Sequence, residues 1–299
     1  MLSPEAAIMR IQGATRSEKG FRVLHSKGRF YDATFTATPE AAALCRAGHL
    51  RGEPVSALVR WSNGAGFPFG GDDRPDVRGM AVSFTLPDGT ATDLLGQTAP
   101  RFPVRSGEDF VKLLEATSSP WRLPVFLATR PSTALALVAN ARAKALAPPR
   151  SYAEATYFPI HAYRWLDESG AGTWVRYTLV PLARESDRPA GTFTGKDRLA
   201  DEIEARLAAG PASYDLRVTT AAGGDDPHDP MSLWRGDRTF SAGRLDVTAP
   251  AEDPEASGGI VVFDPTRVVD GIELSDDPVL HFRPRAYGVS ADLRSGDRG

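Results

Sequence analysis

Alternating apolar and polar positions predict strands in two separate stretches of the chain. The first stretch has runs rich in β-branched and aromatic residues, which are typical of half-buried strands, at 29–38, 55–61, 80–86 and about 90–95. The second has such runs at 158–167, 173–180, 216–221, 244–248 and 259–263. Turn residues separate neighbouring runs, as in Leu86-Pro87-Asp88-Gly89. The pattern therefore predicts roughly eight strands that follow one another in hairpins.

Helical patterns lie at the start of the chain and between the two groups of strands. Ser3, Pro4 and Glu5 form a helix start, and this helix is expected to end near Gly13. Further helices are predicted from caps and apolar spacing, at 39–46, 109–116, 131–146 and 196–208. Consecutive strands with inserted and C-terminal helices favour an α+β fold, an antiparallel eight-stranded β-barrel rather than a βαβ sheet. We expect a single domain over residues 1–299.

Composition narrows the classes of function. The net charge is −3 in 299 residues, which argues against a nucleic-acid or anionic-membrane partner because both normally require a basic face. Cys45 is the one cysteine, so neither an internal disulfide nor a cysteine-cluster metal site is expected. No apolar run is long enough to span a bilayer, and the first residues lack the pattern of a signal peptide. We expect a cytoplasmic protein.

Several common sites have no support in the sequence. The glycines at 64, 66, 70 and 71 do not have the GxGxxG spacing of a dinucleotide site. There is no GxSxG motif for a serine hydrolase. The five histidines form no HExxH or HxH pair. The sequence therefore gives no support for a dinucleotide-binding enzyme, a serine hydrolase or a histidine-based metal site.

Five short segments stand out in the remaining sequence. They are RVLHSKG at 22–28, RWS at 60–62, RGMA at 78–81, DLLGQTAPRF at 93–102 and RPRAY at 283–287. In this order they resemble the haem-side motifs of the haem catalases. Two further runs, FDP at 263–265 and GIE at 271–273, resemble the catalase sequence just before the last motif. The resemblance implies a catalase-like barrel that binds haem.

The resemblance assigns catalytic roles to residues on both faces of a haem. It implies that His25 is the distal histidine, which moves a proton between the two oxygens of peroxide. Ser62 would hydrogen-bond this imidazole and fix its orientation. Tyr287 would be the axial iron ligand, and Arg283, four residues earlier, would donate to its oxygen if the segment is helical. Taken one at a time, these residues equally fit an ordinary buried histidine and an interface tyrosine.

Other matches concern the haem periphery and the access channel. The resemblance implies propionate binding by three arginines, Arg22, Arg60 and Arg294. Phe110 would lie against the haem and Phe102 would line the distal pocket, and core packing is compatible with both roles. Asp76 matches an aspartate of the main channel.

Some positions depart from the catalase pattern. The distal asparagine of the family is Gln97 here, which is one methylene longer. A channel valine falls at Gly64, so a wider channel is expected. The chain ends five residues after Arg294, so we expect no counterpart of the long C-terminal helical domain of large catalases. With these features the chain resembles the minimal catalase-related peroxidases.

The function that this resemblance implies is peroxide reduction on haem, and haem b is the expected type. The expected substrates are hydrogen peroxide or organic hydroperoxides with small organic electron donors, and dismutation is expected to be weak. A homodimer is a possible assembly. Two alternatives remain open: a hydroperoxide lyase or isomerase like the allene oxide synthases, and a non-enzymatic haem-binding barrel.

Overall fold

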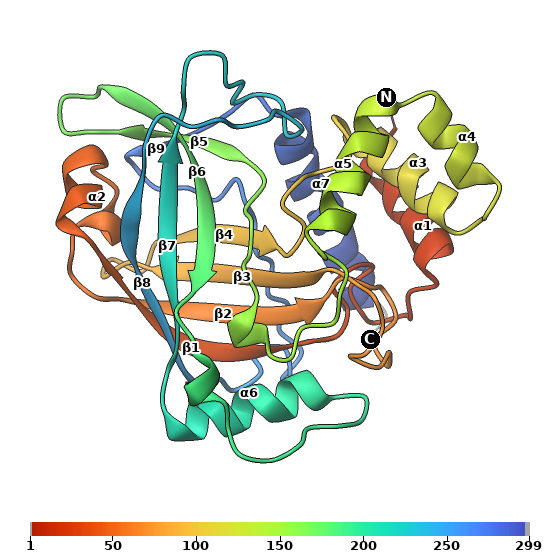
Figure 1. Ribbon diagram of the computed structural model, residues 1–299, viewed down its shortest axis with the longest axis horizontal. Helices are drawn as coiled ribbons and strands as arrows, with labels where there is room; N and C mark the ends of the chain where they lie inside the picture. Colours follow the sequence, from red (N-terminus) through yellow and green to blue (C-terminus); the bar gives the residue numbers. More distant parts are fainter. Residues whose placement is uncertain (1, 297–299) are drawn as a thin grey trace.

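The computed structural model describes residues 2–296, and within them the centre of the molecule is a curled antiparallel sheet (Figure 1). Its strand order is β4-β3-β2-β1-β8-β7-β6-β5-β9. The strands are β1 Gly28–Ala37, β2 Val55–Asn63, β3 Arg78–Thr85, β4 Ala91–Gln97, β5 Ala162–Leu166, β6 Gly172–Pro181, β7 Ala212–Thr220, β8 Thr239–Pro250 and β9 Ile272–Leu274. The predicted antiparallel, barrel-like α+β fold is confirmed, with nine strands in the sheet rather than eight.

A four-strand meander of β1 to β4 and a second one of β5 to β8, with β9 added at the edge beside β5, form the sheet and meet where β1 pairs with β8. The register shifts at Asp32/Ala33 in one pairing and at Leu216/Arg217 in another, and such bulges increase the local bend of a sheet. At the end of β4, Gln97 and Phe158 exchange backbone hydrogen bonds of 3.2 and 2.8 Å. The edge of the first meander is therefore tied to the segment that leads into the second.

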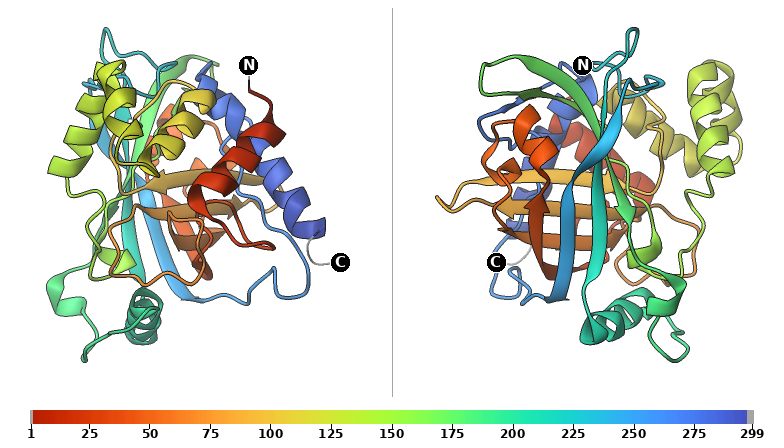
Figure 2. Two further views of the ribbon diagram at one scale, coloured as in Figure 1. Left: turned by 90° about the vertical axis from the view of Figure 1, so that its right-hand side faces the viewer. Right: turned by 60° about the vertical axis from the view of Figure 1, so that its left-hand side comes forward.

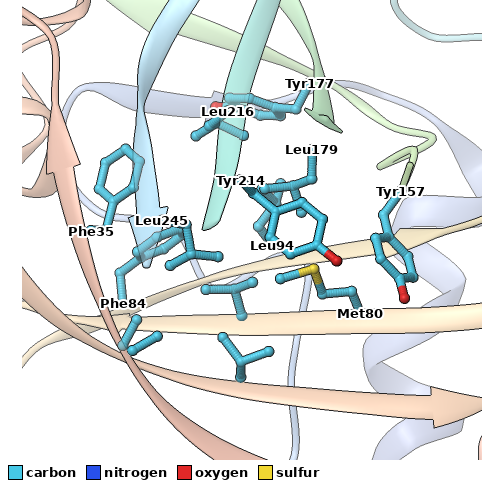
Figure 3. Close-up of a cluster of buried hydrophobic side chains, with 14 of the residues drawn as sticks. Phe35, Met80, Phe84, Leu94, Tyr157, Tyr177, Leu179, Tyr214, Leu216 and Leu245 are labelled. Atoms are coloured by element: carbon cyan, nitrogen blue, oxygen red, sulfur yellow. The ribbon is translucent and has the colours of Figure 1, made fainter. Parts of the chain in front are cut away.

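The concave side of the sheet encloses an aromatic-rich core (Figure 3). Trp61 and Tyr152 stack with their ring centroids 5.9 Å apart, and Tyr31 meets Trp61 edge to face at 5.0 Å. Such pairs add to the free energy gained by burying the rings. This packing fixes the position of β2, the strand that carries Arg60 and Ser62.

Helices cover one end of the sheet. Three of them come between β4 and β5 in the sequence. The helix at the start of the chain, α1, packs beside the helix at its other end, α7 (Figure 2). The α-helices are α1 Pro4–Thr15, α2 Pro39–Leu44, α3 Gly107–Thr117, α4 Arg122–Ala128, α5 Pro131–Arg142, α6 Arg198–Ala209 and α7 Pro278–Gly296. Short 3₁₀ turns are η1 Gly48–Leu50, η2 Tyr152–Glu154 and η3 Glu185–Asp187. Within residues 2–296, no helix has the length and apolar character needed to cross a bilayer.

The structure corrects three details of the predicted elements. No strand forms at 259–263, because polar side chains rather than a neighbouring strand bond its backbone: Val261 donates to Glu255 and accepts from Arg22. The strand predicted from 158 begins at Ala162. Helix α4 was not predicted; its Pro124 lies in the first turn, where the missing N–H costs no helical hydrogen bond.

Candidate active site

His25 lies in the loop between α1 and β1 and is held from two sides. Its backbone N–H donates to the carbonyl of Gly64 at 3.0 Å, and its Nδ1 is 3.0 Å from Ser62 Oγ. Its φ of 54° is in the left-handed region, which few residues other than glycine adopt, although histidine is one of the more tolerant types. The structure thus brings His25 and Ser62 together, and the bonds to the His25 backbone and ring fix the orientation of the imidazole.

Gly79 on β3 lies directly against the imidazole. A Cβ built on Gly79 would lie 2.6 Å from His25 Nδ1 and 2.9 Å from Ser62 Oγ, closer than carbon atoms approach such groups. Gly79 is also the register partner of Ser62 across β2 and β3. Only glycine therefore leaves room for the hydrogen-bonded pair at this point of the sheet.

Replacing Gly79 with alanine is expected to push the imidazole away from Ser62. A displacement of about 1 Å at a reacting group typically costs about a hundredfold in rate, so we expect a loss of this order in kcat/KM for peroxide with haem binding retained. Steady-state kinetics and a hemin titration measure the two effects. Gly13→Ala is the matched control, because a Cβ at Gly13 meets nothing within 4 Å. Unchanged kinetics in Gly79→Ala would show that the ring position is not critical.

Tyr287 lies on α7 at one end of a chain of hydrogen bonds. Arg283 Nε donates to the Tyr287 hydroxyl oxygen at 2.7 Å, so the (i, i+4) contact forms although Pro284 lies inside the helix. Arg283 Nη1 is 2.8 Å from His161 Nε2, and His161 Nδ1 is 2.6 Å from a carboxylate oxygen of Asp277. The order is Asp277, His161, Arg283 and Tyr287.

The protonation state of His161 follows from its partners. Arginine has only donors, so His161 Nε2 must accept from Arg283, and the ring proton then lies on Nδ1, from which it is donated to Asp277. Burial lowers the pKa of His161 to about 4 despite the opposing effect of Asp277. The neutral ring thus links a buried carboxylate to the guanidinium and holds Arg283 toward the phenol oxygen.

Positive charge acts on His25 as well. Burial, followed by the charges of Arg60, Arg283 and Arg22, lowers the pKa of His25 to about 3. Arg283 hydrogen-bonds Tyr287 and is also near enough to act on His25, so the histidine and tyrosine sides belong to one electrostatic environment. A neutral imidazole at neutral pH is the form that can accept a proton.

The three arginines predicted to bind propionates come together around one carboxylate. Glu255 bonds Arg22 and Arg294, and Arg60 donates to the carbonyl oxygens of His25 and Ser26 at 2.9 and 3.2 Å. Burial, with repulsion from Arg22, lowers the pKa of Arg60 to about 9. Three guanidinium groups with one carboxylate leave an excess of buried positive charge. We call Arg22, Arg60, Arg294 and Glu255 the arginine cluster.

Phe102 and Phe110 stack on each other with ring centroids 5.5 Å apart. Phe102 is buried in an apolar cluster that residues of α3 and α4 form with the loop before α3, Ile160 and Val279, and Phe110 packs against that cluster. Their packing with the helices is therefore observed, and their predicted contact with haem stays a prediction.

The channel positions show one departure from expectation. The space beside Gly64 is filled, because a Cβ there would overlap the Val77 side chain and lie 2.9 Å from Asp76 Oδ1. The expected widening at Gly64 is thus not supported by the packing. Asp76 accepts from the backbone N–H of Ala65 at 2.8 Å, and burial raises the pKa of its carboxyl. Gln97 is half-buried at the end of β4.

Four site residues were missed from the sequence. His161 and Asp277 are 116 positions apart, and no local spacing marks either one. Glu255 lies in an irregular turn with no motif signal. Gly79 was part of a recognised segment, but its role lies in the close approach of backbone to imidazole, which only the structure reveals.

The residues fit a haem. The cluster can neutralise anionic groups, since its buried charge is in excess and the Nε of Arg60 has no hydrogen-bond partner in the described structure. Tyr287 offers a single oxygen donor, which suits an iron whose other ligands come from a porphyrin. Among residues 2–296 no group of three or more His, Cys, Asp and Glu is arranged to hold a bare metal ion. Tyr287 would bind the iron and the arginines would bind the propionates.

Several known proteins resemble this chain in sequence or in fold. A sequence profile of the family described as Catalase matches residues 8–186. A "Catalase-related peroxidase" of Mycolicibacterium paratuberculosis is 45% identical over all of this chain and 97% of the relative, and one of Synechococcus elongatus is 28% identical over 98% and 89%. A solved bacterial catalase and a fungal catalase superpose with TM-scores of 0.77 and 0.78 at 20% identity. The chain spans about 60% of the length of those two catalases.

Proposed function

Because this chain belongs to the catalase family, and is therefore an oxidoreductase that acts on peroxide, we propose that it works chiefly as a haem b peroxidase. It would reduce hydrogen peroxide or organic hydroperoxides and oxidise small organic donors, with weak dismutation. The observation that carries this proposal is the pairing of His25 with Ser62 and of Tyr287 with Arg283 in one electrostatic environment.

The residues of the chain divide the chemistry between them. Bound haem would supply the iron centre that takes up oxidising equivalents from peroxide. Neutral His25 would accept a proton from one peroxide oxygen and return it to the departing oxygen, and Ser62, 3.0 Å from the imidazole Nδ1, would hold the ring in position. Arg283 donates to the Tyr287 hydroxyl oxygen and so fixes the position of that oxygen. His161 and Asp277 hold Arg283 in position.

The preference for peroxidation depends on Gln97. Dismutation needs a second peroxide held in a defined pose, and an amide one methylene longer than asparagine places its hydrogen-bonding groups differently. A wide channel at Gly64 would have been a second reason to expect weak dismutation, but the space beside Gly64 is filled, so this reason does not apply.

A substrate comparison tests this preference. We expect cumene hydroperoxide with an organic donor to be turned over at least as fast as hydrogen peroxide with the same donor. Oxygen release from hydrogen peroxide alone, followed with an oxygen electrode, should be slow. Gln97→Asn should raise oxygen release relative to donor oxidation. Rapid oxygen release by the unaltered protein would reject the proposed order of activities.

The names of the relatives do not favour the two alternatives. Product analysis with a lipid hydroperoxide and no donor would detect a lyase or isomerase, and a carrier would be unaffected by loss of His25. The proposal also includes one haem-binding domain over residues 1–299, a homodimer and a cytoplasmic location. Limited proteolysis, sedimentation and cell fractionation test these three points.

A further inference from the structure

A carboxylate of the chain itself occupies the arginine cluster. Glu255 Oε2 accepts from Arg22 Nη1 at 2.8 Å, and Glu255 Oε1 accepts from Arg22 Nη2 and Arg294 Nη1, both at 2.9 Å. The backbone N–H of Val261 also donates to Oε1 at 2.9 Å. The Glu255 side chain is only 9% exposed. Both terminal nitrogens of Arg22 are therefore bonded to a buried internal carboxylate.

These bonds occupy the two Arg22 nitrogens to which an external carboxylate would bind. A guanidinium binds a carboxylate best through two parallel N–H···O bonds, and Arg22 already makes such a pair with Glu255. A second carboxylate at the same two nitrogens would meet the first at close range, and two like charges there repel each other. An incoming carboxylate that is to bind Arg22 in this way must therefore displace Glu255.

The segment that carries Glu255 is suited to such a displacement. Residues 253–259 form a turn outside every helix and strand, and most of its residues are exposed. Asp253 Oδ1 accepts from the Glu255 backbone N–H at 2.9 Å, and Gly258 has a φ of 88°. Surface turns of this kind change conformation at lower cost than paired strands. The arginines, in contrast, come from the loop before β1 and from α7.

We propose that Glu255 is a built-in competitor of the haem carboxylates, which holds Arg22 and Arg294 in the apoprotein and releases them when haem binds. This inference rests on the proposed haem function. Two effects of opposite sign follow for removal of the charge: the apoprotein loses stability because the arginines lose their anion, and haem binds more tightly because no internal carboxylate has to be displaced.

The test compares Glu255→Gln with the unaltered apoprotein in titrations with two ligands. The first ligand is iron protoporphyrin IX, and the second is its dimethyl ester, which has no carboxylates. For the acid, we expect the Kd of Glu255→Gln to be about tenfold lower than that of the unaltered protein, because one charge-assisted hydrogen-bonding competitor is lost. For the ester, we expect the two proteins to have equal Kd values. Urea unfolding of the apoprotein should show a lower midpoint. Glu252→Gln, an exposed position directly before this segment, is the matched control and should change none of these values.

The outcomes separate this inference from the haem function. If the unaltered protein binds the acid and Glu255→Gln binds it equally or more weakly, Glu255 is not a competitor, and the haem function stands. If the unaltered protein binds neither ligand, the haem function fails and the competition fails with it. Glu255→Asp keeps the charge on a side chain one methylene shorter. This variant replaces Glu255→Gln in the test if the glutamine variant does not fold. We expect it also to bind the acid more tightly than the unaltered protein does and the ester equally well.

Discussion

Tyr287→Phe is expected to abolish stable haem binding and, with it, peroxidase activity. The change removes one oxygen and keeps the ring, so the packing of α7 is preserved. Loss of an outer hydrogen-bond partner of a metal ligand typically costs about 10–100-fold in affinity, and loss of the proposed ligand itself should cost more. Arg283 Nε also loses the acceptor that it contacts at 2.7 Å.

A hemin titration followed by visible absorption measures this effect, and denaturant unfolding of the apoprotein shows whether the variant is folded. Tyr31→Phe is the matched control, because the Tyr31 hydroxyl is buried and has no hydrogen-bond partner in the described structure. It should bind haem as the unaltered protein does. If Tyr287→Phe retains haem with an unchanged spectrum, Tyr287 is not the iron ligand.

His25→Asn is expected to lower kcat/KM for peroxide by about 10²–10⁴-fold, the usual contribution of a general acid–base group. Asparagine suits this experiment because it tolerates the left-handed backbone that His25 adopts at φ 54°. Haem binding should be retained, since His25 is assigned no bond to the haem. Arg16→Asn, at an exposed left-handed position with φ 52° outside the site, is the matched control and should keep full activity.

The pH profile of the unaltered enzyme bears on the same residue. A base must be neutral to accept a proton, and the pKa of His25 is lowered from 6.5 to about 3, so the active form persists as the pH falls from 7 to 5. An unshifted histidine would lose roughly 20- to 30-fold of its neutral form over that range. Initial rates should therefore stay nearly level. A fall centred near pH 6.5 would show that the environment of His25 does not suppress its protonation.

Contiguous motifs made part of the site predictable. His25 and Ser62 lie in short segments with recognisable neighbours, and the hairpins that bring β2 beside β3 are marked by turn residues and alternating strands. The contact between Arg283 and Tyr287 was predicted on the condition that their segment is helical, and the structure meets that condition. Each of these inferences depends on residues within a few positions of one another, which is the range over which sequence pattern reports on structure.

The features that the sequence did not reveal depend on contacts between residues far apart in the chain. His161 comes just before β5, and Asp277 just before α7, so their contact depends on how the second meander packs against the C-terminal helix. The false strand at 259–263 has the same origin, because its β-branched residues favour a strand but the segment pairs with no strand of the sheet. Its backbone is bonded instead by Glu255 and Arg22, a solution that propensity does not encode.

The packing of α1 beside α7 has a consequence for biosynthesis. His25 and Arg22 leave the ribosome early, whereas Tyr287 and Arg294 are translated near the end, so a nascent chain has one face of the site long before the other. Chains generally fold in the order of synthesis, N-terminal parts first. Cofactor capture must therefore be a late event in the maturation of this protein, after translation has delivered the helix that completes the pocket.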